Sequence, residues 1–541
     1  MKTNKTYIVL FMLLLAVAGC KKSFLDEKVY SAYAPETLKD SLGFEASITG
    51  LENHLSTFFS YSDQQGWPSV WQVGTDVAFA SQAQGIEVPY YNYATLTSTD
   101  GAALYTWSWA YRMINNTNII IANVEDPSVT SMAQASKNSI DAEARFYRAY
   151  AYNILATCFG GVPVITKPLS GPKTDFVRAP LDSVNDLIVS DLQYASANLP
   201  DIDNVKSNTK GKMYSRPNLA MAQQLLAEAY LRMNKPDLAE QQCQQIINSG
   251  KFSLIKTRYG IKAAKPGDYF SDMFQYGNER RNQGNSEAIW VMEQENPNAV
   301  TGGITNNPQQ RRVWGAAYYQ ISGMIITDSL GGRGIARLRL SNWLLYGLYD
   351  QYDMRNSQWN IRRQFYYNDV TKANYGQPVP YTGPDTVFKI CPHTTKWYQF
   401  DPNDVFGFAM VKDFILMRLG ETYLLMAEAQ FKQGHLQDAA NSINVLRQRA
   451  YPDYPTHGQV QASDITLDFI LDERARELIG EENRRMTLMR TGTLVTRATA
   501  LNSNSVQNPI SGLTNKNLLL PIPQQEIDLN KDAKLEQNPG Y

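Results

Sequence analysis

The sequence predicts a mainly α-helical protein in which helix pairs form a scaffold and a long irregular portion rests on it. A helix-hairpin pattern occurs twice, at 219–248 and at 419–450. Elsewhere apolar residues recur every three or four positions, which is the spacing of one face of an α-helix. Between 251 and 411 this spacing largely disappears, and Gly, Pro, Asn and aromatic residues are dense. An irregular segment this long inside a compact protein usually carries function.

The N-terminus has the features of an export signal. Lys2 and Lys5 precede an apolar run from Tyr7 to Ala18, which is shorter than the roughly 20 apolar residues that a membrane span needs. Small residues then lead directly to Cys20, an arrangement that resembles the lipobox of bacterial lipoproteins. We therefore expect residues 1–19 to be removed as a signal peptide and Cys20 to be acylated. The alternative is a plain secretory signal in which the cysteine is incidental.

The mature chain divides into a leader, a helical region, an irregular insertion and a second helical region. The leader is 20–48, a largely polar segment that would act as a tether, and the first helical region is 49–250. Periodicity and capping residues predict helices over 44–61, 104–125, 139–159, 183–199, 216–233 and 236–248. The stretch 67–99 breaks the helical pattern, since Gly, Pro, Ser and Thr occur throughout it, and it is predicted to be a loop with short extended pieces.

The second half begins with the insertion 251–411, in which only 341–352 has a helical pattern. The region 412–541 then returns to helix, with the second hairpin and a charged amphipathic helix over 466–490. On that helix Glu473, Arg474, Arg476 and Glu477 form an acid and base cluster. We interpret the cluster as an exposed helix face held by i,i+3 ion pairs worth about 0.2–0.5 kcal/mol each, rather than as a catalytic site.

The two hairpins match at the positions where helices would touch. The corresponding residues are Leu219, Leu225, Ala227, Ala229 and Ala239 in the first copy and Leu419, Leu425, Ala427, Ala429 and Ala439 in the second. Asn234 and Gly434 each follow a first helix, and both residue types tolerate the left-handed conformation of a helix end. Alanines at these offsets resemble tetratricopeptide repeats, whose units need stacked neighbours to bury their apolar faces.

Composition excludes several function classes. A net charge of −1 argues against nucleic-acid binding, and 43% hydrophobic with 19% charged residues is typical of a globular chain. Cys158, Cys243 and Cys391 are too few and too scattered for a disulfide framework, and the first two are expected to be buried thiols on helix faces. The four histidines are not spaced as metal ligands, so neither a metal site nor a cofactor is expected.

An ordered set of short motifs resembles one family, the SusD/RagB nutrient-binding outer-membrane lipoproteins of Bacteroidetes. The motifs are Phe24-Leu25-Asp26 after the lipobox, Tyr111 to Asn118, Glu143 to Tyr150, Phe159 to Pro163, Asn285 to Trp290, Asp472 to Leu478, Arg490-Thr491-Gly492, Leu520 to Pro523, and Asn538 to Tyr541. Each is weak alone, but they occur in order across the mature chain.

This resemblance implies a fold, a location and a partner. The fold would be a helical scaffold of about four tetratricopeptide-like helix pairs with a loop-rich portion that carries the ligand site. The protein would be a non-enzymatic lipoprotein at the outer face of the outer membrane. It would capture a glycan, either an oligosaccharide or a polysaccharide, and pass it to a SusC-like TonB-dependent transporter.

The candidate ligand-binding residues are aromatic and lie in two irregular stretches. They are Tyr90, Tyr91 and Tyr93 in 67–99, and Arg312, Trp314, Tyr318 and Tyr319 in 296–330. Rigid aromatic rings can stack on the C–H face of a sugar while neighbouring polar groups bond its hydroxyls. We predict that the two stretches converge on one exposed face as an aromatic platform. The alternative is that the rings pack beneath their own loops.

Two other functions are compatible with parts of the sequence. A secreted glycan hydrolase would need two carboxylates about 5–9.5 Å apart in a cleft, and no pair is marked by its sequence context. A tetratricopeptide scaffold for protein partners would explain the helices but not the aromatic insertion.

Overall fold

The computed structural model of the protein describes residues 39–60, 64–82, 84–296, 300, 308–399, 405–406, 410–502 and 507–541. The predicted signal peptide, Cys20 and most of the leader therefore lie outside the described residues. Helix makes up 48% and strand 6% of the structure, which confirms the mainly helical fold class. None of the helices in the described ranges is both long and apolar enough to span a membrane.

The longer helices lie outside residues 251–411. The helices are α2 (Ser41–Phe59), α3 (Trp67–Val70), α4 (Gly101–Glu125), α5 (Gln134–Phe159), α6 (Leu181–Asn198), α7 (Leu219–Arg232), α8 (Pro236–Asn248), α9 (Tyr269–Asp272), α10 (Gln310–Trp314), α11 (Leu419–Lys432), α12 (Leu436–Ala450), α13 (Leu467–Leu478), α14 (Arg484–Arg490), α15 (Leu494–Leu501) and α16 (Gln524–Leu529). The strands are β1 (Ala78–Ala80), β2 (Ser207–Asn208), β3 (Gly211–Lys212), β4 (Ala288–Met292), β5 (Leu338–Leu340), β6 (Ile361–Arg362), β7 (His393–Thr394) and β8 (Phe414–Arg418).

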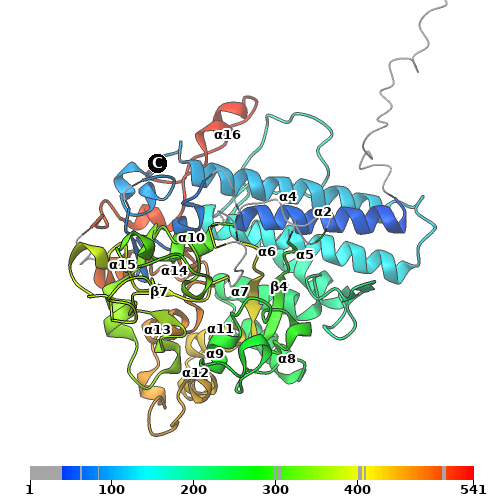
Figure 1. The fold of residues 1–541 in the computed structure, drawn as a ribbon. Helices are drawn as coiled ribbons and strands as arrows, with labels where there is room; N and C mark the ends of the chain where they lie inside the picture. Colours follow the sequence, from blue (N-terminus) through cyan, green and yellow to red (C-terminus); the bar gives the residue numbers. More distant parts are fainter. Residues whose placement is uncertain are drawn as a thin grey trace, which may run out of the picture.

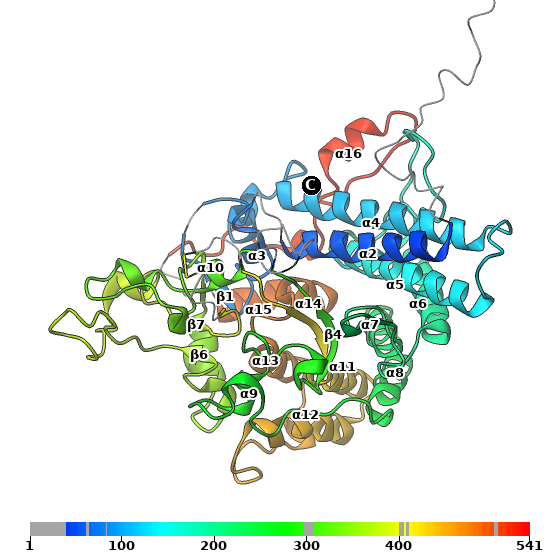
Figure 2. The same ribbon diagram turned by 45° about the vertical axis from the view of Figure 1, so that its right-hand side comes forward.

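The scaffold is one continuous stack of helices. Helices α4 to α8 pack against one another in chain order, and α8 then packs against α11, which packs against α12. In Figure 2 the blue and cyan helices lie above, while the green α7 and α8 lie beside the yellow α11 and α12. The two repeat copies are therefore neighbours in space although the insertion separates them in sequence (Figure 1).

The repeat residues occupy the helix contacts that the pattern predicts. The alanines common to both copies, Ala227, Ala229, Ala239, Ala427, Ala429 and Ala439, are fully buried. Asn234 and Gly434 have φ values of 55° and 80°, the left-handed conformation of a helix end. Across the junction the Thr422 hydroxyl donates to the Gln224 side chain at 2.6 Å.

A short antiparallel sheet joins strand β4, within the insertion, to strand β8, which directly follows the insertion. Strands β4 and β8 pair from Ala288 opposite Arg418 to Met292 opposite Phe414. Within the insertion β6 pairs with β7. Strand β5 pairs with β1 from the loop 67–99, with Phe79 opposite Arg339. The two irregular stretches of the sequence are thus joined by backbone hydrogen bonds.

The charged cluster of α13 is buried, so the prediction of an exposed helix face is wrong. Glu477 accepts hydrogen bonds from Arg355 at 2.9 Å and Arg418 at 2.6 Å, and also from Arg449. Burial alone would raise the pKa of Glu477, but these three arginines hold it well below its usual value. The cluster links the insertion to β8, α12 and α13, and it has a structural role.

Three helix predictions also need correction. The helix predicted over 341–352 is only the π-helical segment Trp343–Leu348. The helix predicted over 466–490 is divided into α13 and α14, because Gly480 has a φ of 81° and packs against Trp397 where a Cβ would crowd. Helix α5 starts at Gln134 rather than at Ser139. Cys158 and Cys243 are buried free thiols, as predicted.

Candidate functional site

The tyrosines of the loop 67–99 lie inside the protein. Tyr90, Tyr91 and Tyr93 are at most 5% exposed. The Tyr90 hydroxyl donates to Asp100 at 2.7 Å, and burial together with that carboxylate raises the pKa of Tyr90. Arg485 donates to the Tyr93 hydroxyl at 2.7 Å and lies over the Tyr90 ring. Arg485 of α14 therefore contacts the face of Tyr90 and the hydroxyl of Tyr93, and these contacts hold the loop against α14.

The second predicted group is mostly buried as well. Trp314 is 2% exposed and Tyr318 1%, and Arg312 is also buried, with a pKa that burial lowers. Tyr318 stacks on Phe365 and donates to the Gly332 carbonyl at 2.9 Å. Tyr319 is half-buried beneath the guanidinium of Arg333.

The prediction of an exposed aromatic platform is therefore wrong, although the two stretches do converge. Helix α10 packs against α3, and the Gln310 side chain donates to the Phe59 carbonyl at 2.8 Å. Trp67, Trp71 and Trp314 line one internal cavity of about 70 Å³. The rings fill the space between the loops and the scaffold, which removes their apolar area from water. We refer to Tyr90, Tyr91, Tyr93, Trp314 and Tyr318 as the buried ring group.

Other aromatic residues of the insertion are exposed. Among the described residues, the large aromatic side chains that are more than a third exposed all come from one part of the chain: Tyr346, Tyr352, Trp359, Tyr366, Tyr375 and Phe406. Tyr352 is stacked on His457, which gives that ring a packing role. Tyr346 differs because polar and charged side chains surround it.

Tyr346 and its neighbours form a polar aromatic surface. Tyr346 is 57% exposed, and its hydroxyl lies 3.1 Å from that of Tyr381. Arg339 reaches the Tyr381 hydroxyl at 3.5 Å and donates to the Asn342 side chain at 2.9 Å. Arg363 donates to the Leu345 carbonyl at 2.9 Å. We call Arg339, Asn342, Tyr346, Arg363 and Tyr381 the tyrosine surface.

The fold explains why these side chains lie together. Arg339 is held in β5, where its guanidinium lies 5.4 Å from the ring centroid of Phe79 on the paired strand. Trp343–Leu348 is a single π-helical segment that buries Leu344 and Leu348 and turns Tyr346 outward. Burial and the hydrogen bond with Tyr346 raise the pKa of Tyr381, so the Tyr381 hydroxyl stays protonated at neutral pH.

The tyrosine surface has the groups that sugar recognition needs. The exposed ring of Tyr346 offers a face for stacking, and Asn342 and the two tyrosine hydroxyls offer donors and acceptors beside it. The buried Arg339 holds Asn342 and Tyr381 in position. Sequence reasoning missed this group, but one signal was present. In the segment from Trp343 to Leu348 the leucines form the apolar side, so Tyr346 falls on the opposite side.

No group of three or more His, Cys, Asp or Glu side chains that could hold a metal ion is found in the described part of the chain. Glu473 and Glu477 form ion pairs with arginines and are fully buried, so they do not line an open cleft.

Comparisons with known proteins agree on one family. Residues 339–541 match the family model described as "SusD family", and residues 23–231 match the one described as "Starch-binding associating with outer membrane". SusD-like protein P25 of Formosa agariphila is 24% identical over 97% of this chain and 96% of its own length.

Solved structures share the fold over nearly the whole chain. A SusD homolog from Bacteroides thetaiotaomicron superposes with a TM-score of 0.73 at 19% identity, over 94% of this chain and 99% of that one. Surface glycan-binding protein A of the same species, in complex with laminarihexaose, has a TM-score of 0.70 at 18% identity, over 92% of this chain and 99% of that one.

Proposed function

The chain belongs to the SusD family, and on that premise we propose that it captures a nutrient glycan at the cell surface and delivers it to a SusC-like TonB-dependent transporter. Proteins of this family are non-catalytic glycan-binding proteins. A hydrolase is therefore set aside, and so is a tetratricopeptide scaffold for protein partners, because a glycan-binding role uses the aromatic insertion as well as the helices.

The tyrosine surface is the observation that supports glycan capture by this particular chain. A polysaccharide is too long to enter a closed cavity, so its binding site has to be open. Tyr346 is an exposed ring whose hydroxyl lies beside a second tyrosine hydroxyl, that of Tyr381. A stacked ring on a shallow surface binds modestly, since one side stays in water and sugar hydroxyls must be desolvated. Modest affinity suits a protein that must release its ligand to a transporter.

The glycan proposal is tested by binding without cleavage. Purified protein is titrated with starch and laminarin oligosaccharides, and the products are separated to check that chain length is unchanged. The Tyr346→Ala variant should bind the preferred glycan at least tenfold more weakly, while Tyr352→Ala, whose ring is already stacked on His457, should bind like the wild type. Equal binding by the wild type and Tyr346→Ala would show that the tyrosine surface is not the glycan-binding site.

We propose that Cys20 carries a lipid anchor, because a lipobox directly precedes it. Acyl chains stabilise membrane attachment by about 0.8 kcal/mol per buried CH₂, so several chains hold a protein firmly. Replacing Cys20 by alanine should abolish incorporation of labelled palmitate and release the protein from the outer membrane. Continued labelling of the variant would contradict the lipoprotein assignment.

The transporter partner is proposed from family membership alone. Extraction of the native membrane with a mild detergent should co-purify a large β-barrel protein with this chain. Recovery of a lone monomer in several mild detergents would contradict a stable complex.

A further inference from the structure

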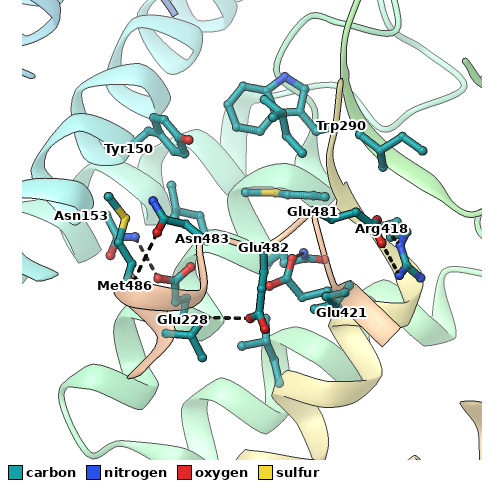
Figure 3. A pocket seen from close by; sticks show the side chains of 18 of the residues that line it. Tyr150, Asn153, Glu228, Trp290, Arg418, Glu421, Glu481, Glu482, Asn483 and Met486 are labelled. Carbon is teal, nitrogen blue, oxygen red and sulfur yellow. Dashed lines mark hydrogen bonds and ion pairs between the residues drawn. The ribbon is translucent and has the colours of Figure 1, made fainter. Parts of the chain in front are cut away.

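A central chamber of about 150 Å³ lies where the two repeat copies meet. Its lining comes from α2, α5, α7, β4, β8, α11, α13 and α14, together with the turn that joins the last two helices. Figure 3 shows the labelled side chains of these elements turned toward a shared space. The chamber therefore lies among the scaffold helices and the β4–β8 sheet, and its lining includes none of the residues of the tyrosine surface.

One wall of the chamber is aromatic and apolar. The rings of Tyr150 and Trp290 meet edge to face, with centroids 5.3 Å apart at 81°. Leu225, Leu425 and Met486 also line the chamber. A second cavity, lined by Trp67, Trp71 and Trp314 among others, shares Phe58, Phe59 and Glu482 with it.

The opposite end of the chamber holds a carboxylate with no ion-pair partner among the described residues. Glu228 accepts only one hydrogen bond there, from the Asn153 amide at 3.2 Å. Arg490, which also lines the chamber, instead makes a two-pronged ion pair with Glu428, at 2.7 Å for each contact. Glu228 is half-buried, and its carboxylate oxygens can accept further hydrogen bonds.

Two donors at the same end are also unused. Arg474 binds Glu421 and Glu482 through Nη2 and Nε, but its buried Nη1 makes no hydrogen bond. The Tyr150 hydroxyl makes none with any described residue. It lies close enough to Glu228 and Glu421 for both carboxylates, after burial, to raise its pKa. A buried donor without an acceptor is destabilising, so Arg474 Nη1 favours a ligand that accepts a hydrogen bond there.

The chemistry of these groups selects the kind of ligand. An anion would meet the carboxylates of Glu228, Glu421 and Glu482. A cation would pair with Glu228 but leave Arg474 Nη1 without an acceptor. Neutral hydroxyl groups both donate and accept, so they can bond Glu228, Arg474 and Tyr150 at once.

We infer that the chamber is a second binding site, for one neutral sugar ring or a cyclic polyol of that size. A cavity of about 150 Å³ holds a six-membered ring, and the C–H face of the ring would lie on the wall of Tyr150 and Trp290. The inference does not depend on glycan capture at the tyrosine surface, because the two sites share no residue.

Calorimetric titration of the full mature chain with D-glucose, D-galactose, D-xylose and myo-inositol tests this inference. We expect at least one of the four to bind with a stoichiometry of one, and ammonium chloride and sodium acetate to give no heat of binding. Tyr150→Phe removes one hydroxyl and keeps the ring, and Glu228→Met removes the carboxylate at similar length; each should weaken that binding at least tenfold. Tyr346→Ala should leave it unchanged.

A crystal soaked in the bound sugar supplies the second measurement, and it stays informative if a variant fails to fold. Density for a sugar ring between Tyr150, Glu228 and Arg474 is the expected result. A chamber that holds only water in the soaked crystal overturns the inference, as does the absence of binding by all four compounds. Starch and laminarin binding by Tyr150→Phe should equal that of the wild type, so failure of this site and failure of the proposed function are distinguishable.

Discussion

The buried ring group and the tyrosine surface contain the same kinds of side chain in the same kind of irregular backbone, yet one is inside the protein and the other faces solvent. The difference lies in what surrounds each segment. The loop 67–99 and helix α10 lie between the scaffold and the insertion, so their rings are covered from both sides. Tyr346 is carried on a π-helical segment whose opposite side is already packed. Aromatic content in a loop therefore indicates burial as readily as binding.

The largest expected effect is a loss of stability when a member of the buried ring group is truncated. Trp314→Ala removes a ring that is almost completely enclosed, and truncation of such a side chain costs about 3–5 kcal/mol. Chemical denaturation monitored by circular dichroism should show that loss, whereas the exposed Trp359→Ala should change stability little. The folded fraction of Trp314→Ala should bind glycan with wild-type affinity. A stable Trp314→Ala variant with weak glycan binding would show that Trp314 belongs to the ligand site.

The next effect tests the exposed side. Tyr346→Ala should leave the melting temperature unchanged, because the Tyr346 side chain is 57% exposed. It should cost at least about 2 kcal/mol of glycan binding, as truncation of an anchor residue does. Affinity electrophoresis in polysaccharide gels measures the binding, and scanning calorimetry measures the stability. A lower melting temperature with unchanged migration would show that this ring, too, has a packing role.

A smaller effect concerns the scaffold that both groups depend on. Ala427→Leu inserts side-chain volume at a fully buried contact between helices, which typically costs about 1–3 kcal/mol. The melting temperature should fall, and glycan binding by the folded fraction should be retained. The same substitution at Lys432, on the same helix but less buried, is the matched control. An unchanged melting temperature for Ala427→Leu would contradict the repeat packing.

The smallest effect concerns a titrating group in the scaffold. Burial, and then the nearby Glu143, raises the pKa of Glu52 from 4.5 to about 7, against the opposing effect of Arg216. The folded protein therefore binds this proton more tightly than the unfolded chain, so the stabilising contribution is present below pH 4.5 and is lost as pH rises to about 7. Glu52→Gln should raise the melting temperature at pH 8 but not at pH 4.5. The exposed Glu536→Gln should do neither.

Much of the scaffold was predictable because its signals are local. Alanine spacing and the left-handed positions Asn234 and Gly434 depend on a few neighbouring residues, and the structure confirms them. The candidate site was not predictable in the same way. Burial of Trp314 depends on the contact between α10 and α3, which are far apart in the sequence. The buried ion pairs of Glu477 depend on arginines from the insertion, β8 and α12, and no single segment specifies them.

The pairing of β4 with β8 has a consequence for how such proteins diversify. Met292 and Phe414 lie opposite each other, so the chain leaves the scaffold and returns to it at adjacent points. The free energy of closing a loop grows only with the logarithm of its length, by about 0.6 kcal/mol for each doubling. The segment between these two strands can therefore be lengthened, shortened or exchanged as a cassette, and new ligand preferences can arise without redesign of the helices beneath.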